Sequence, residues 1–105
     1  MNDLRVVFVT VSSEEEGMKI ARALVARKLA ACVNLVPGVR SVFRWKGEVK
    51  DEKELLLVVK TRESKLAHLV QAVKEHHSYT VPETIALPVV GGAAPYLSWV
   101  RQETS

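Results

Sequence analysis

The residues of this 105-residue chain best suited to chemistry are one cysteine and a pair of adjacent histidines. The single cysteine, Cys32, excludes an internal disulfide and an all-cysteine metal site. Thiolate and imidazole suit copper and zinc, so Cys32, His76 and His77 are candidate metal ligands. A closed structural site usually takes four ligands, which leaves open a weak surface site shared between subunits.

Structural roles compete with metal binding at all three positions. Adjacent side chains on a helix point about 100° apart, so His76 and His77 do not chelate as a pair four residues apart would. His77 follows Leu66 by 11 residues, near the middle of an apolar stripe, which favours a partly buried histidine at a helix end. Cys32 also fits a small core residue.

The sequence carries no convincing catalytic motif. Ser12 and Ser13 precede a run of glutamates in the pattern of a helix cap, and no histidine is near them in the sequence. Gly91-Gly92 follows an expected strand but lacks the wider pattern of a phosphate-binding loop. We therefore expect a protein that is not an enzyme and has no organic cofactor.

Length and composition predict one small domain over residues 1–105. The 15 basic and 12 acidic residues are interspersed, so a nucleic-acid partner is not expected. No apolar run approaches the ~20 residues of a membrane span, and residues 1–4 do not resemble a signal peptide. These features favour the cytoplasm and exclude a membrane partner.

The hydrophobic pattern predicts an alternation of strands and helices. Expected strands cover 5–11, 31–36, 39–45, 49–61 and 83–90, with a stop at Pro37-Gly38 and a two-residue turn at Lys46-Gly47. A first helix is expected after Ser13, with Met18, Ala21, Val25 and Leu29 on one face. A second is expected to begin at residue 63 or 64 and to end near 76–78, and a third lies around 96–100. With 31–45 taken as one arm of a hairpin, this order is the ferredoxin-like βαββαβ sandwich of the α+β class, followed by a C-terminal helix.

Two features predict an oligomer. The strands over 6–9 and 55–59 are apolar on both sides, although helices cover only one face of such a sheet. In addition, the stretch 31–45 would reach roughly 50 Å if extended, against an expected radius of gyration of about 13 Å. It must therefore bend at Pro37-Gly38 or project toward a neighbour with Phe43 and Trp45.

Five segments, in this order and spacing, resemble the CutA family of divalent-cation tolerance proteins. They are AACVN (30–34), SVFRWKGE (41–48), LVVKT (57–61), HSYTVPE (77–83) and YLSW (96–99). The resemblance implies a compact homotrimer linked to tolerance of heavy metals, copper above all, with no established enzymatic activity. It supports Cys32 and His77 as metal ligands, with copper or another divalent cation bound weakly. Ser78 departs from the family, which usually has proline there.

The resemblance also places a cleft between subunits. The residues expected there are Asn34, Trp45, Lys60, Tyr79 and Glu83. Lys60 would need a carboxylate partner, for which Glu83 or Glu52 could serve. A cleft of this kind could hold a small ligand, as in the similar PII signalling proteins, or its residues could form a polar network that fixes the trimer. Three functions stay open: a cation-binding trimer, a PII-like regulator and a structural trimer with an indirect effect on metal tolerance.

Overall fold

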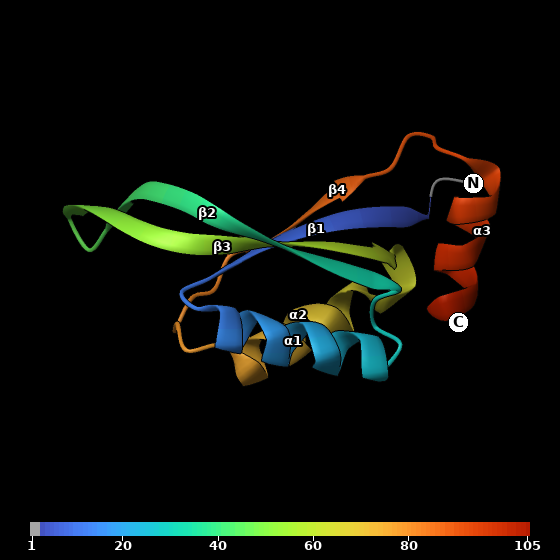
Figure 1. Ribbon diagram of the computed structural model, residues 1–105, viewed down its shortest axis with the longest axis horizontal. Coiled ribbons are helices and arrows are strands. Elements are labelled where there is room, and N and C mark those ends of the chain that lie inside the picture. The colour runs from blue at the N-terminus through green and yellow to red at the C-terminus, as the bar shows by residue number, and fades with distance from the viewer. Residues whose placement is uncertain (1–2) are drawn as a thin grey trace.

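The computed structural model describes residues 3–105, and Met1 and Asn2 lie outside the described residues. Its elements follow the expected order (Figure 1). They are β1 (Leu4–Val11), α1 (Glu14–Ala26), β2 (Cys32–Trp45), β3 (Glu48–Arg62), a short 3-10 turn (Glu63–Lys65), α2 (Leu66–His76), β4 (Thr84–Pro88) and α3 (Ala94–Glu103).

The four strands form one antiparallel sheet in the order β2-β3-β1-β4. Helices α1 and α2 cover one face, and α3 packs across one end of the sheet (Figure 1). This confirms the predicted ferredoxin-like α+β fold. Pro88 ends β4 at an edge of the sheet, where a residue without a backbone N–H is tolerated.

The hairpin of β2 and β3 is much longer than its neighbours, and its outer part extends beyond the rest of the molecule (Figure 1). The molecule measures 44 × 25 × 23 Å as a result. The turn at Lys46 and Gly47 has φ angles of 50° and 81°, which matches the twist of a two-residue hairpin turn. Of the two expected alternatives, a bend at Pro37-Gly38 or a projecting arm, the structure shows the projection, together with a bulge at these residues (Figure 1).

The predicted strand stop at Pro37-Gly38 is wrong. β2 runs through these residues with a bulge between Val36 and Val39, and Gly38 takes a φ of 79°. A bulge absorbs the extra residue and bends the strand without ending its pairing. The charged stretch 51–54 lies in β3, in agreement with the expected strand over 49–61; Glu54 is buried there, and the other three residues are exposed.

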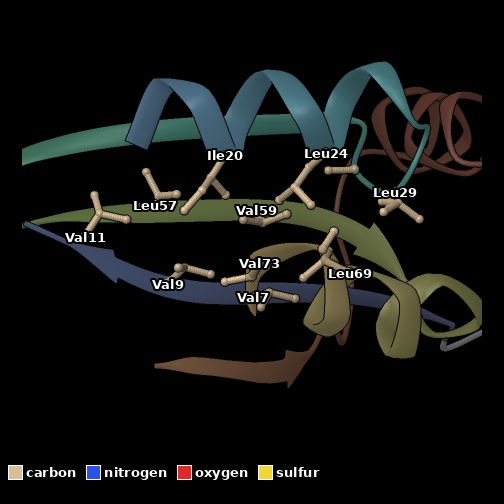
Figure 2. Close-up of a cluster of buried hydrophobic side chains, with 12 residues drawn as sticks. Val7, Val9, Val11, Ile20, Leu24, Leu29, Leu57, Val59, Leu69 and Val73 are labelled. Atoms are coloured by element: carbon tan, nitrogen blue, oxygen red, sulfur yellow. The ribbon is translucent and has the colours of Figure 1, made fainter. Parts of the chain in front are cut away.

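The core lies between the helices and the sheet. Figure 2 shows Ile20 and Leu24 of α1 pointing toward Leu57 and Val59 of β3. Gly17 allows this close approach, since a Cβ there would lie 3.1 Å from Val11 Cγ2 and 3.2 Å from Leu35 Cδ2. Each buried aliphatic side chain contributes roughly 1.5–3 kcal/mol by leaving water.

The first helix differs from the prediction in its face and its end. Ser13 caps it as expected, accepting from the backbone N–H of Glu16. The buried side includes Ile20, Leu24 and the predicted Ala21, whereas Val25 is 45% exposed. The helix ends at Ala26 because Lys28 turns into the left-handed region, with a φ of 58°.

Candidate functional site

His77 follows α2, and its fully buried side chain lies against the end of β1. Its Nε2 donates to the carbonyl oxygen of Thr10 at 2.7 Å, and its Nδ1 accepts from the backbone N–H of Tyr79 at 3.0 Å. These partners assign a neutral ring with the proton on Nε2. Both ring nitrogens are used inside the chain, so a metal ion could bind here only if one of these hydrogen bonds broke.

His76 and Cys32 point elsewhere. The Nδ1 of His76 donates to the carbonyl oxygen of Ala72, one turn back in α2, at 2.8 Å. Cys32 is partly buried at the start of β2, and burial together with the neighbouring Cys32 thiol raises the pKa of Tyr96 in α3.

Sheet register separates Cys32 from His77 within one chain. Cys32 pairs with Lys60 and so lies level with Val6, whereas His77 binds Thr10, four residues farther along β1. Four strand residues span roughly 13 Å. Over residues 3–105, no three His, Cys, Asp or Glu side chains lie close enough together to hold a metal ion. The three candidate ligands therefore form no common site in a single chain, and a site shared between copies stays a prediction.

Glu16 is a site residue that sequence reasoning assigned only to the helix cap. One carboxylate oxygen accepts the backbone N–H of Ser78 at 2.6 Å, and the other accepts the hydroxyls of Ser78 at 3.1 Å and Ser12 at 3.3 Å. The carboxylate also lies 3.5 Å from His77 Nδ1. Since that nitrogen accepts from Tyr79, we interpret the approach as close packing rather than an ion pair. In the sequence, the position of Glu16 three residues after the capping Ser13 was the only indication of a role for this carboxylate.

Tyr79 and Glu54 form a second contact that the sequence did not reveal. The Tyr79 hydroxyl donates to Glu54 Oε2 at 2.8 Å, and Glu54 is only 6% exposed. Burial and the neighbouring Glu54 carboxylate raise the pKa of Tyr79 to about 12. Glu54 lies at the boundary between the charged residues 51–54 and the apolar residues 55–59 of β3. This position next to the apolar run was the only sign in the sequence that the acid is buried.

The five expected cleft residues do not gather in one chain. Lys60 donates to the side-chain oxygen of Asn34, and a carboxylate partner from Glu83 or Glu52 in a cleft between subunits stays a prediction. Tyr79 lies near the base of the hairpin arm, and Trp45 is at its tip, where the Lys46 ammonium lies 5.8 Å from the indole ring. Glu83 is exposed just before β4.

Residues 5–103 match the family described as CutA1 divalent ion tolerance protein. The chain belongs to the CutA1 family. Over 99 residues it is 52% identical to the divalent-cation tolerance protein CutA of Thermus thermophilus, covering 94% of this chain and 96% of that one. It is 50% identical to the chloroplastic protein CutA of Arabidopsis thaliana, again over 94% of this chain.

Solved structures agree with the CutA1 assignment. The divalent cation tolerance protein Cut A1 of Thermus thermophilus superimposes with a TM-score of 0.95 at 51% identity, over 97% of this chain and 99% of that chain. CutA1 of Oryza sativa superimposes with a TM-score of 0.95 at 48% identity, over 99% of this chain and 95% of that chain. The chain spans about half the length of the Arabidopsis and human relatives, at 54% of each.

The CutA1 site geometry does not favour acid–base chemistry at His77. A histidine that activates a serine needs a ring nitrogen within reach of the hydroxyl. Here Nε2 donates to Thr10, and Nδ1 accepts from Tyr79. The hydroxyls of Ser12 and Ser78 donate instead to Glu16.

Glu16 predicts a pH-dependent contribution to the stability of this CutA1 chain. Burial acts to raise the pKa of the carboxyl, but hydrogen bonds from Ser78 outweigh burial and hold the pKa below its ordinary value of 4.5. A lowered folded-state pKa gives stability that is present above 4.5 and lost as the pH falls below it. We expect Glu16→Gln to cost about 1–3 kcal/mol at neutral pH and to reduce the loss of stability below pH 4.5.

Urea unfolding at several pH values measures this effect. Glu15→Gln is the matched control, because Glu15 is an exposed residue in the same helical turn. Parallel pH profiles for wild type and Glu16→Gln would contradict the assignment.

Proposed function

We propose that this CutA1 family member is a non-enzymatic homotrimer that contributes to cation tolerance by binding divalent metal ions, copper first among them, weakly and in the cytoplasm. No helix within residues 3–105 is long and apolar enough to cross a membrane. Family membership supports cation tolerance. The proposed trimer and the proposed shared metal site are both argued from an exposed apolar face of the sheet.

The observation that carries the proposal is an apolar sheet face that α1 and α2 leave uncovered within residues 3–105 (Figure 1). Val7, Val9 and Leu57 point into the core, so alternate residues of the same strands point away from the helices. Register aligns these residues across four strands. The apolar residues of this open face are Val6, Phe8, Val36, Leu56, Val58, Ile85 and Leu87, and Thr10, Asn34 and Lys60 lie among them.

A second copy is the occupant that best fits the open face. Ile85 is 56% exposed and Leu87 41%, and contiguous apolar patches of this extent are rare on monomers. β2 is an edge strand of 14 residues whose outer part carries Phe43 and Trp45. A projecting arm with a free backbone edge suits strand addition to a neighbour.

Assembly also offers the route to a metal site. Cys32 and the two histidines lie apart in one chain, so they could act together only if different copies supplied them. A shared site with few ligands would bind weakly and exchange its metal readily, in keeping with tolerance rather than structural storage.

Calorimetric titration with copper and zinc tests the metal part of the proposal. We expect wild type to release heat and the triple variant Cys32→Ala, His76→Ala, His77→Ala to lose it. Because His77 is buried, the double variant Cys32→Ala, His76→Ala is measured as well. His68→Ala is the matched control, since His68 is exposed on the same helix as His76. Equal heats from wild type and both multiple variants would reject these ligands.

A second candidate function is a PII-like regulator that binds a small ligand. The observation in its favour is a pocket of about 270 Å³ that has Arg5, Lys60 and Tyr96 among its otherwise largely apolar lining. A metabolite that binds the native state raises the melting temperature. A thermal-shift screen of small carboxylates and nucleotides would therefore reveal it, with Lys60→Met as the variant expected to lose the shift.

A further inference from the structure

The hairpin arm leaves the sheet at a sharply defined point. Val11, the last residue of β1, pairs with Leu55 of β3. Beyond that pair, within residues 3–105, β3 has a strand partner only in β2, and β2 bulges between Val36 and Val39 just opposite. The arm is therefore a two-stranded ribbon that begins at a bulge. Such ribbons are marginal by themselves, and bulges bend and twist the strand.

Tyr79 contacts the arm at this same point. Glu54 is the first residue of β3 beyond the last pair with β1, and it pairs with Val39 directly after the bulge. The Tyr79 hydroxyl donates to its carboxylate at 2.8 Å. Whereas residues 51–53 of the arm are exposed, Glu54 is buried. The Tyr79 side chain therefore contacts β3 just beyond the point where the pairing of β3 with β1 ends.

The loop that carries Tyr79 is itself fixed to the body of the domain. His77 binds the carbonyl oxygen of Thr10 in β1, accepts the backbone N–H of Tyr79 and packs against its ring, with centroids 4.7 Å apart. Ser78 donates both its N–H and its hydroxyl to Glu16 in α1. A proline at position 78 could make neither bond. Tyr79 is thus held by β1 and α1 independently of the arm.

We propose that the 77–79 loop sets the angle at which the hairpin arm leaves the sheet, with Tyr79 as the positioning residue that holds Glu54. The inference deepens the proposed function, because the arm is the element through which copies are proposed to meet. An arm free to pivot at the bulge would have to be ordered during association, at a cost in entropy. By fixing the arm, the contact between Tyr79 and Glu54 holds Phe43 and Trp45 in one orientation toward a neighbouring copy.

Tyr79→Phe tests the inference by removing one hydroxyl while keeping the ring. We expect hydrogen exchange of the arm amides over 39–53 to become at least fivefold faster, with exchange in β1 unchanged. Sedimentation should show self-association about tenfold weaker. Glu54→Gln keeps an acceptor for the Tyr79 hydroxyl and should stay close to wild type.

Tyr96→Phe is the matched control, because that hydroxyl contacts Cys32 at the other end of the sheet. It should leave arm exchange at the wild-type rate. Unchanged arm exchange in Tyr79→Phe would overturn the inference, whatever happens to assembly. If wild type sediments as a single chain, the proposed trimer fails, yet the exchange comparison still decides whether Tyr79 holds the arm.

Discussion

Phe8→Asp is expected to convert the assembled protein into single chains of 11.7 kDa. Phe8 lies in the middle of the open face, in a cross-strand row with Val58 of β3 and Ile85 of β4. In a single chain an aspartate there would stay in contact with water. In an assembly it would become an unpaired buried charge, which costs at least about 3 kcal/mol and lowers the association constant by roughly two orders of magnitude.

Sedimentation velocity at micromolar concentration checks this result. Val70→Asp is the matched control, because Val70 is 42% exposed on α2, on the opposite side of the sheet. We expect this control to sediment like wild type. A Phe8→Asp variant that is folded and keeps the wild-type mass would show that the open face is not where copies meet.

Leu57→Ala is expected to lower the free energy of unfolding by about 2–5 kcal/mol. Leu57 is fully buried in the middle of β3, facing α1 and bordered by Val9 and Val11 of the neighbouring strand (Figure 2). Because Gly17 already brings the helix backbone close to Leu57, little adjustment remains to fill the cavity. The loss should therefore include a cavity penalty in addition to the lost transfer energy.

Chemical denaturation measures this loss. All proteins are compared at one concentration, since assembly couples stability to concentration. Val25→Ala is the control and should change stability by less than about 0.5 kcal/mol, because Val25 is largely exposed on α1. A Leu57→Ala variant as stable as wild type would mean that the core in Figure 2 is not the main source of stability.

Much of the fold could be predicted because it depends on local patterns. The Ser13 cap, the turn at Lys46-Gly47 and the alternation of strands and helices each follow from a few neighbouring residues. The errors arose where a distant element decided the outcome. β2 continues through Pro37-Gly38 because β3 offers a pairing partner on both sides of the bulge, and no local pattern reports that partner.

The candidate site depended even more on long-range contacts. His77 was noticed for its chemistry, but the Thr10 carbonyl oxygen that accepts from its Nε2 is 67 residues away in the sequence. Glu16 and Ser78 meet across 62 residues, and Glu54 and Tyr79 across 25. None of these pairs has a spacing that predicts contact, because the packing of helix on sheet brings them together.

By itself, the sequence determined the α+β class and an apolar sheet surface too large for the chain's own helices, since periodicity and composition encode both. It also indicated the family, through the resemblance of five segments in order and spacing. Only the tertiary structure decided that Cys32 lies apart from the histidines and that Tyr79 and Glu54 meet at the base of the arm. The physical reason is that strand register and helix packing set distances between residues remote in the chain. A chemical motif specifies residue types, whereas the folded sheet specifies which of them can touch.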